Sequence, residues 1–217
     1  MSSKPISPSG TESVALCGVL LAAGSATRFG GHKLLAPLMG GTPVAVAAAM
    51  NMVAALTQVV AVVRPGDERL AELLRQCGAE VLFCRDAHRG MGHSLACAIN
   101  ATPAATGWVV GLADMPAIRP QTIAAIAGEV ASGAAIAAPC YRQKRGHPVA
   151  FAAQWRAQLQ ALSGDQGARS VIERQRHQLV LIECDDEGVL LDIDCPADLK
   201  GVSGFSSRDN HNDEQGR

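Results

Sequence analysis

A glycine-rich loop with two cations is the first stretch whose residue types could do chemistry. Residues 20–33 read LLAAGSATRFGGHK, so an apolar run ends in a loop that carries Arg28 and Lys33 and no acid. A strand, such a loop and then a helix present backbone N–H groups to a phosphate, while cations offset its charge. A Walker A loop is excluded because Leu34 follows the lysine, and Ala26 breaks the dinucleotide-binding pattern G-x-G-x-x-G. The stretch indicates a phosphate-binding loop, with an ordinary surface turn as the alternative.

Acidic residues at two places could hold a divalent cation. Asp114 follows the apolar run 108–113. A carboxylate at the carboxyl end of a buried strand can hold Mg²⁺ against phosphate oxygens, although a turn or helix-cap aspartate is the alternative. Asp192 and Asp194 alternate on a predicted short strand and would point to one face, with Asp198 on the turn beyond. These acids could complete a metal site or form a solvated turn.

Three further segments combine small and polar residues where a ligand could approach. Residues 90–94, GMGHS, open a predicted helix, where small residues would admit a ligand to free N–H groups or would form a plain N-cap. His147, in the turn GHP at 146–148, could bind substrate or could be merely exposed. Asp165, in the segment SGDQGAR at 163–169, is a candidate cap for the helix that follows.

Strands that alternate with helices must position these side chains. Apolar runs predict strands at 14–21, 58–63, 81–84, 108–112, 134–138, 179–183 and 189–193, with a further strand entered from the turn at 145–151. Helices are expected at 43–56, 68–77, from about 90 to 101, and at 120–131, 153–162 and 167–175. This alternation predicts an α/β fold with a mostly parallel sheet and helices on both faces. Ligands bind such sheets outside the carboxyl ends of the strands, where the loops 22–33, 89–94 and 113–116 are expected.

Composition narrows the class of protein. The chain has 217 residues, 48% of them hydrophobic and 3% aromatic, with a net charge of −1, which favours neither nucleic acid nor an anionic membrane as partner. Seven cysteines without a C-x-x-C pair argue against a disulfide framework or a structural zinc site. No apolar run approaches the ~18 residues of a membrane span. We expect a cytoplasmic protein with one domain at 13–200, a disordered extension at 1–12 and a disordered tail at 201–217.

Several of these motifs together resemble one family. The pattern L-A-A-G-x-x-x-R-F-G-x-x-K-L-L at 21–35 is similar to the signature loop of the sugar-nucleotide-type nucleotidyltransferases, and most of all to the molybdenum cofactor cytidylyltransferase (MobA/MocA-like) group. Further segments match family motifs in the family's order: G-M-G-x-S-L, L-A-D-M-P, G-H-P, G-D-x-G-A-R and D-I-D-x-P-x-D-L. The resemblance covers about residues 16–200, and the ordered set is much more specific than any one motif.

The resemblance implies a three-layer, Rossmann-like mostly parallel sheet of the nucleotide-diphospho-sugar transferase type. It also implies a magnesium site held by Asp114 and Asp194, with Asp198 as a cap of the last helical turn. The site residues carried over by the motifs are: catalytic, Arg28, Lys33 and Asp114; nucleotide-binding, Leu21, Ala22, Ala23, Gly24, Arg28, Lys33, Gly92, Ser94 and Asp114; substrate-binding, His147 and Asp165.

The activity implied is transfer of CMP from CTP to the terminal phosphate of molybdopterin, with release of pyrophosphate. The similar guanylyltransferases have L-A-G-G where this chain has L-A-A-G, so Ala23 argues for cytosine. A molybdenum hydroxylase is the expected recipient of the product, and neither nucleic acid nor membrane is an expected partner. One alternative keeps the fold and transfers the nucleotide to a sugar or polyol phosphate. Another is a carrier that inserts molybdenum cofactor without turnover, although Lys33, Asp114 and Asp194 would then have no reason to be present together.

Overall fold

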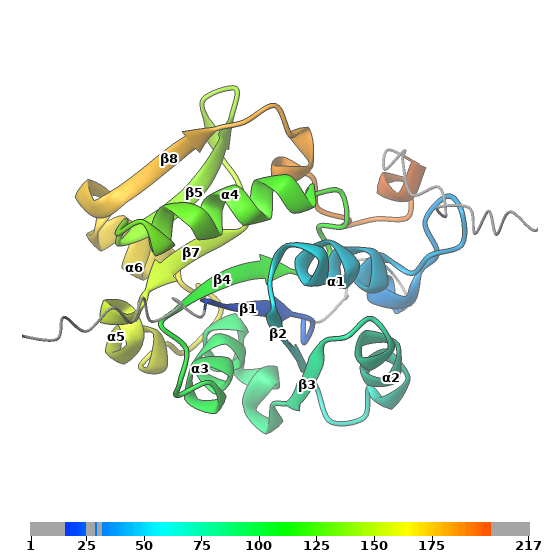
Figure 1. The fold of residues 1–217 in the computed structure, drawn as a ribbon. Coiled ribbons are helices and arrows are strands. Elements are labelled where there is room, and N and C mark those ends of the chain that lie inside the picture. Colours follow the sequence, from blue (N-terminus) through cyan, green and yellow to red (C-terminus); the bar gives the residue numbers. More distant parts are fainter. Residues whose placement is uncertain (1–15, 25–28, 30–31, 201–217) are drawn as a thin grey trace, which may run out of the picture.

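The computed structural model describes residues 16–24, 29 and 32–200 of the chain. The expected extension at 1–12, the tail at 201–217 and the candidate catalytic residue Arg28 lie outside the described residues. Figure 1 shows the described part as a sheet with helices on both sides. The predicted α/β class with a three-layer, mostly parallel sheet is confirmed.

One mixed sheet of eight strands forms the middle layer, in the order β3-β2-β1-β4-β7-β5-β6, with β8 paired to β5. The pairs β1–β2, β1–β4, β2–β3 and β5–β8 are parallel, whereas β7 is antiparallel to both β4 and β5. The strands are β1 Leu16–Leu21, β2 Gln58–Val63, β3 Glu80–Phe83, β4 Gly107–Leu112, β5 Ile136–Tyr141, β6 Lys144–Arg145, β7 Val149–Ala152 and β8 Leu179–Glu183.

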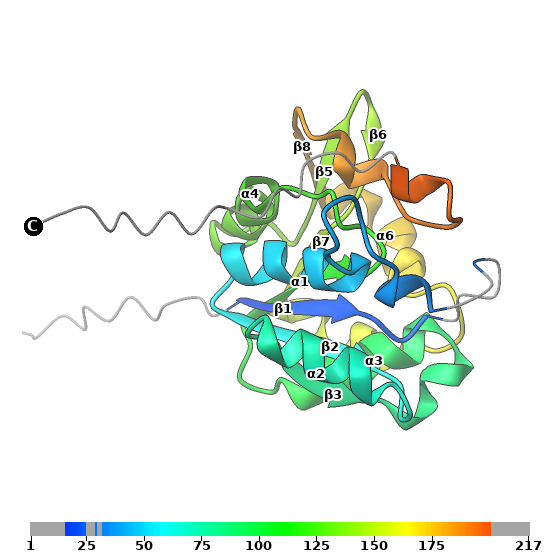
Figure 2. The ribbon, with the colours of Figure 1, turned by 90° about the vertical axis from the view of Figure 1, so that its right-hand side faces the viewer.

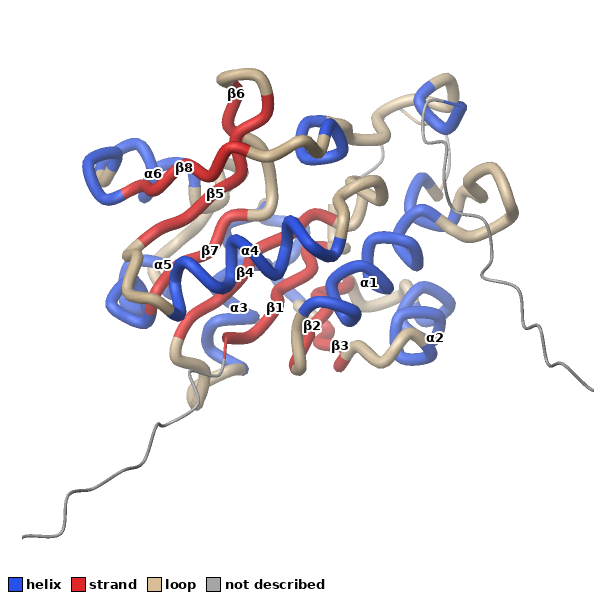
Figure 3. Tube along the Cα trace, turned by 45° about the horizontal axis from the view of Figure 1, so that its top comes forward, coloured by secondary structure: helices blue, strands red, loops and turns tan. Residues whose placement is uncertain are grey.

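In the described ranges, six α-helices cover the two faces of the sheet. They are α1 Val44–Ala55, α2 Glu68–Gln76, α3 Met91–Ala101, α4 Pro120–Ala131, α5 Arg156–Gln160 and α6 Arg169–Arg174. Buried residues of α1, α2 and α4 form one hydrophobic core, and those of α3, α5 and α6 form a second. Figure 2 shows α1 and α4 on one side of β1 and α3 on the other, and Figure 3 shows α4 lying over β4.

Successive side chains of strand β1 pack alternately into the two hydrophobic cores. Leu16 and Leu20 belong to the core under α1, α2 and α4, whereas Cys17 and Val19 belong to the core over α3. Successive side chains of a strand point to opposite faces, so a strand buried on both faces must be apolar throughout. Gly18 lets α1 pack closely, because a Cβ there would lie 2.8 Å from the Leu56 side chain and 3.0 Å from that of Met52.

Short 3₁₀ turns complete the chain. They lie at Lys33–Leu35, Arg85–Arg89, Ala153–Trp155, Arg176–Gln178, Glu187–Leu190 and Asp198–Lys200. Most predicted elements are present within a residue or two, and the strand at 58–63 and the helix at 120–131 have the predicted bounds. Strand β5 is shifted toward the carboxyl end, to Ile136–Tyr141, and the helix expected at 153–162 is a 3₁₀ turn followed by the shorter α5.

The strand predicted at 189–193 is wrong. Residues Glu187–Leu190 form a 3₁₀ turn, and 191–194 have no regular secondary structure and belong to no strand of the sheet. The buried carboxylate of Asp186 accepts the N–H of Gly188, and Gly188 packs directly on the backbone of Ala117. This tertiary contact holds the chain in a turn despite its strand-like pattern of apolar residues.

None of the helices in the described ranges has the length and apolar character needed to cross a lipid bilayer.

Candidate functional site

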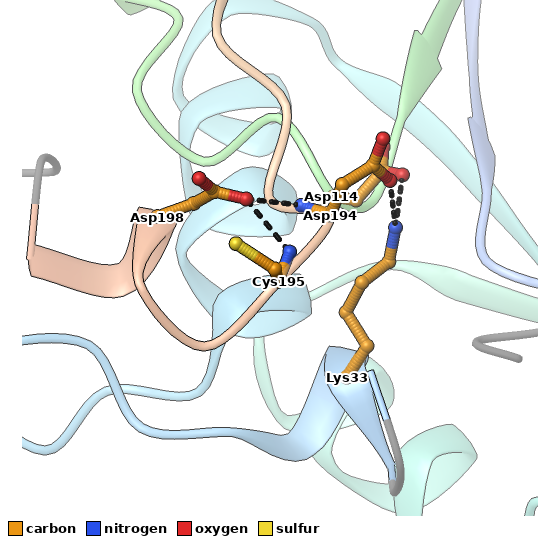
Figure 4. Close-up of polar contacts among 5 residues, drawn as sticks. All are labelled: Lys33, Asp114, Asp194, Cys195 and Asp198. Atoms are coloured by element: carbon orange, nitrogen blue, oxygen red, sulfur yellow. Dashed lines mark hydrogen bonds and ion pairs between the residues drawn. The ribbon is translucent and has the colours of Figure 1, made fainter. Parts of the chain in front are cut away.

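A lysine lies between two aspartates from distant parts of the chain. The Lys33 ammonium donates to Asp114 Oδ2 at 2.8 Å and to Asp194 Oδ1 at 3.2 Å (Figure 4). Lys33 begins the 3₁₀ turn after the glycine-rich loop, Asp114 follows β4, and Asp194 lies in the segment after the turn Glu187–Leu190. The structure thus brings together three candidate residues that are as much as 161 positions apart in sequence.

Backbone hydrogen bonds hold Asp194 beside Asp114. The N–H of Ile193 donates to the carbonyl oxygen of Asp114 at 2.9 Å, so the two aspartates are anchored to each other through the main chain. Asp198 Oδ2 then accepts the N–H groups of Asp194 at 2.9 Å and Cys195 at 2.7 Å. These bonds lower the pKa of Asp198, with the bond from Cys195 as the largest cause.

Two expectations about this acidic segment are corrected. Asp198 does not cap a helix that follows it, because it is itself the first residue of the turn Asp198–Lys200, and its carboxylate closes the preceding turn instead. Asp192 and Asp194 do not alternate on a strand, because this segment pairs with no strand among the described residues. Burial and the charge of Asp194 raise the pKa of Asp192. In the described part of the chain, the ion pairs of Lys33 are with Asp114 and Asp194.

The charges at this cluster are strongly interdependent. Burial alone would lower the pKa of Lys33, but its hydrogen bonds and charge attraction to Asp114 and Asp194 outweigh burial and raise that pKa above the ordinary value. The side chains of Lys33 and Asp114 are 13% and 24% exposed, while Asp194 is 54% exposed. Lys33 is therefore protonated at neutral pH and compensates carboxylates that would otherwise repel each other.

The chemistry of these two carboxylates would suit a divalent cation. Asp114 Oδ1 is buried and has no hydrogen-bond partner among the described residues, which leaves it available as a ligand. Both aspartates reach the same ammonium nitrogen, so one cation can contact both. Within the described ranges no group of three or more His, Cys, Asp and Glu side chains could form a closed metal cage. Magnesium characteristically uses one or two carboxylates plus water and phosphate oxygens.

A cavity of about 470 Å³ opens beside Asp114 at the carboxyl edge of the parallel strands. Its wall includes Leu21, Ala23, Gly24 and Ser94 of the predicted nucleotide-binding set. Ala22 and Lys33 line a neighbouring cavity of about 430 Å³, which shares Gly24 and Arg64 with the first. Ala22 itself is buried and donates its N–H to the carbonyl oxygen of Val62. The loops after β1, β3 and β4 meet here, as expected for an α/β sheet.

Gly92, predicted to bind nucleotide, packs against a segment far along the chain. Its N–H donates to the carbonyl oxygen of Gly164 at 2.8 Å, and a Cβ on Gly92 would lie 2.7 Å from the carbonyl oxygen of Ser163. The segment 163–165 therefore occupies the space that the absent side chain leaves. Gly92 supports this segment, while Gly90, Met91 and Ser94 form the helix end that faces the cavity.

Asp165 lies on the wall between two cavities. It lines the cavity beside Asp114 and also a second cavity of about 390 Å³, and both cavities include Leu21, Met91 and Leu112 in their walls. Asp165 does not cap the following helix, since α6 begins only at Arg169, and its N-cap Ala168 has no side-chain cap bond. The expected cap is therefore wrong, and Asp165 remains a candidate for binding substrate.

His147 lies in the largely apolar second cavity, whose wall also includes Phe151 and Val149. Burial and the neighbouring Arg145 lower the pKa of His147 to about 4, although Asp114 acts in the opposite direction. Its Nδ1 is buried without a hydrogen-bond partner in the part of the chain that the structure describes. A neutral imidazole with an unused nitrogen is suited to hydrogen-bond a ligand. The alternative of a merely exposed histidine is wrong.

Two contributors to the site were missed in the sequence. Arg64, directly after β2, donates from Nε to the carbonyl oxygen of Ala23 at 2.7 Å and lines two cavities. Its place at the carboxyl end of a buried strand was the available signal. His93 accepts the N–H of Gly164 at Nδ1 over 3.2 Å and so positions the segment 163–165, which no pattern in the sequence indicated.

Comparisons with known proteins identify the family of the chain. Residues 18–179 match the MobA-like NTP transferase domain. The chain is 33% identical over 193 residues to "Nicotine blue oxidoreductase" of Paenarthrobacter nicotinovorans, covering 85% of this chain and 94% of that protein. Among solved structures, Rv0371c of Mycobacterium tuberculosis H37Rv is 28% identical with a TM-score of 0.71, covering 85% of this chain and 95% of that one.

Two further structures extend the comparison. A manganese complex of Rv0371c is similar at a TM-score of 0.69 and 26% identity, with 85% of this chain and 95% of that chain covered. A nucleotidyl transferase from Methanothermobacter thermautotroptrophicus shares the fold at a TM-score of 0.73 and 21% identity, with 85% and 94% covered.

Proposed function

Since the chain belongs to the MobA-like NTP transferase family and is a nucleotidyltransferase, we propose that it transfers CMP from CTP to the terminal phosphate of molybdopterin in the cytoplasm. The observation that carries this proposal is the contact of Lys33 with both Asp114 and Asp194 beside two adjoining cavities. One cavity would hold the nucleotide and the other the acceptor. The product would then pass to a molybdenum hydroxylase.

The reaction needs positioning and charge compensation more than covalent catalysis. An acceptor phosphate oxygen attacks the α-phosphorus of CTP, and pyrophosphate leaves. Asp114 and Asp194 would hold Mg²⁺, which supplies positive charge to the phosphate oxygens when bound. Lys33 already lies at these carboxylates and would donate to phosphate oxygens there, as would Arg28 from the glycine-rich loop. Asp198, through the N–H groups of Asp194 and Cys195, keeps the second carboxylate in place.

The choice of cytosine rests on the wall of the first cavity. Ala23 is 6% exposed and lines this cavity, and its carbonyl oxygen is fixed by Arg64. In the proposed complex, the methyl group of Ala23 would take up space that a glycine would leave to a larger base. Leu21, Gly24 and Ser94 complete the part of the wall that would contact the base and ribose. The position of Ala23 in this wall supports the proposal of cytosine, which comes from the family pattern.

The acceptor would occupy the second cavity. Its apolar side chains, Leu95, Val149, Phe151 and Ile172 among them, would pack on the faces of the flat pterin ring. The polar edge of the pterin would need hydrogen-bonding partners, which Arg145, Gln166 and Arg169 in the same wall could supply. His147 would hydrogen-bond that ring through its unused nitrogen, and Asp165 would do so from the wall shared with the nucleotide cavity. A molybdopterin bound there would direct its phosphate toward Asp114, because the two cavities adjoin.

The test is pyrophosphate release from the purified protein with Mg²⁺, molybdopterin cofactor and each of the four NTPs in turn. We expect release with CTP alone, and loss of release in Asp114→Asn. Better use of GTP than of CTP would refute the base assignment. Release with CTP and a sugar or polyol phosphate, but not with molybdopterin, would refute the acceptor assignment. Tight binding of molybdopterin without any turnover would indicate a carrier.

A second candidate function is favoured by the relative named for an oxidoreductase reaction on nicotine blue, since the similarity extends over most of both chains. A redox reaction needs no pair of carboxylates bridged by a lysine. Decolourisation of nicotine blue in the presence of a reduced nicotinamide, unchanged in Asp114→Asn, would favour this candidate. If Asp114→Asn abolished both the decolourisation of nicotine blue and the release of pyrophosphate, the result would indicate that the variant does not fold.

A further inference from the structure

Strand β8 lies at a margin of the sheet and presents apolar side chains to solvent. It pairs with β5 on one side, and on its other side no described strand is paired with it. Figure 1 shows β8 at the outer margin of the sheet, beside β5. Val180 and Leu181, adjacent in this strand, are 40% and 48% exposed. The strand reads LVLIE, without the lysine or proline that commonly protects a sheet edge.

The opposite margin of the sheet is protected in the usual way. Strand β3 ends in Phe83, which is 37% exposed. The Arg75 guanidinium lies over its ring, 5.8 Å from the centroid. Arg75 belongs to α2, so a side chain of the neighbouring helix partly covers the end of this edge strand. The exposed Phe83 of β3 thus has a helix side chain over it, whereas the exposed Val180 and Leu181 belong to a strand that contains no Lys, Arg or Pro.

The outward backbone groups of β8 can be assigned. The N–H of Cys184, just beyond the strand, donates to the carbonyl oxygen of Cys140 in β5. Backbone groups of alternate residues point to opposite sides of a strand, so those of Val180 and Ile182 also point to β5. The N–H and C=O groups of Leu179, Leu181 and Glu183 then point outward, where they can form a new ladder.

The residues before β8 are basic, and those at its end and beyond are acidic. Two copies of the strand that run in opposite directions would therefore place unlike charges side by side. Arg174, Arg176 and His177 precede the strand, whereas Glu183, Asp185 and Glu187 end and follow it, and all are exposed. We propose that β8 pairs antiparallel with β8 of a second copy of this chain, with Leu181 opposite Leu181 and the basic start of each strand beside the acidic end of the other.

This register uses every free backbone group of the strand. With Leu181 at the two-fold axis, Leu179 of one copy faces Glu183 of the other, and all three outward residues form hydrogen-bonded pairs. His177 faces Asp185 of the second copy, with Arg176 next to it. A parallel arrangement would place like charges side by side at both ends, which is destabilising. Val180 and Leu181 lose exposed apolar area in the pair, and this loss stabilises the dimer.

The test is the mass of the full chain in solution, by sedimentation velocity or light scattering over a range of concentrations. We expect twice the 22.5 kDa of one chain. Leu181→Lys places like charges opposite each other and should yield monomer where the wild type is dimer. Met50→Lys, at a side chain 50% exposed on α1, is the matched control and should remain dimer. Thermal unfolding of each variant establishes that it is folded.

A charge exchange tests the register. Asp185→Lys alone should weaken the dimer at least tenfold, whereas His177→Glu combined with Asp185→Lys should restore it, because the two positions face each other across the axis. A monomeric wild type, or a dimer that persists in Leu181→Lys, overturns the proposal. So does a monomer that dimerises only after removal of residues 201–217, which would assign the edge to the chain's own tail. If Asp185→Lys and the double variant dimerise equally weakly, the proposed register is wrong.

Discussion

At the scale of single residues, Lys33 is the side chain that connects the parts of the site. It contacts Asp114 from β4 and Asp194 from the carboxyl-terminal segment, so the cluster exists only in the folded chain. Because Asp194 is 54% exposed, its ion pair with Lys33 contributes little to stability. The cluster therefore matters more to the chemistry of phosphate groups than to folding.

Replacing Asp114 should separate these two roles. Asp114→Asn removes a charge that would hold the metal, and we expect pyrophosphate release to fall by about 10²–10³-fold, as when one donor to a developing oxyanion is lost. Thermal unfolding should change little, by about 1 kcal/mol or less, because the asparagine still accepts a hydrogen bond from Lys33. Glu72→Gln, on the exposed side of α2, is the control. Near-normal turnover in Asp114→Asn would remove this residue from the reaction.

Ala23 should set the preference for the base. Ala23→Gly enlarges the nucleotide cavity by one methyl group, and we expect the ratio of kcat/KM for CTP over GTP to fall by about tenfold, the usual worth of one such group in a pocket. Ala79→Gly removes a buried methyl that lines neither cavity, and it should leave the ratio unchanged. An unaltered ratio in Ala23→Gly would mean that the base is selected elsewhere.

At the scale of elements, the amino-terminal end of α3 is shaped by a segment far along the chain. Residues 163–165 pack on Gly90 and Gly92 and are fixed by His93. Gly90 has a φ of 118°, a conformation that L side chains rarely adopt, and a Cβ there would meet the backbone of Gly164. This contact joins the helix end at the nucleotide cavity to Asp165 at the boundary of the second cavity.

Two glycine-to-alanine substitutions should have opposite effects. Gly92→Ala places a Cβ 2.7 Å from the Ser163 carbonyl oxygen, so the segment 163–165 must move, and both unfolding temperature and acceptor affinity should fall. Gly128→Ala, in the exposed middle of α4, has no atom within 4 Å of its Cβ and should stabilise the protein by about 0.5–1 kcal/mol. Thermal unfolding and KM for the acceptor measure both. Equal changes in the two variants would contradict the packing argument.

The sequence predicted an element correctly where residues within that element determine its structure. The strand at 58–63 and the helix at 120–131 were found because a continuous apolar run and an N-terminal proline act within the element. The segment 189–193 has the same apolar character, yet Gly188 packs on Ala117 and makes it a turn. The insertion of β7, antiparallel, between β4 and β5 likewise depends on pairings distant in sequence.

Within the site, too, local motifs identified some residues, whereas residues that depend on distant partners were missed. Asp114 and Asp194 were identified because each belongs to a motif that can be read in a few residues. The functions of Arg64 and His93 follow from partners 41 and 71 positions away, which no local pattern indicates. The contact of Lys33 with both aspartates was likewise a result of folding, although each residue had been singled out on its own.

At the scale of the whole molecule, the sheet joins two cavities that adjoin at the carboxyl ends of its parallel strands. The two cavities have Leu21 and Leu112, the last residues of β1 and β4, in their common wall. Val149, the first residue of the antiparallel strand β7, lines the second cavity. A change of strand direction within the sheet therefore separates the proposed nucleotide half from the proposed acceptor half.

Stability should fall as the solution is acidified, in part because of His147. Its pKa is about 4 in the folded chain and about 6.5 when unfolded, so the unfolded chain binds the proton more tightly. The contribution of this group to stability is full above pH 6.5 and is lost as pH falls toward 4, by up to about 3 kcal/mol. Denaturant unfolding between pH 7 and pH 4 should therefore show a smaller loss in His147→Asn. Equal losses in both proteins would contradict the burial of a neutral imidazole.

The most direct test of the proposed reaction follows the two ends of CTP separately. Purified protein is given Mg²⁺, molybdopterin cofactor and CTP labelled with ³²P at either the α or the γ position. We predict that the α label appears in the acceptor and the γ label in pyrophosphate, with both transfers lost in Asp114→Asn. An α label that remains in CTP, or that appears only as free CMP, would contradict transfer to molybdopterin.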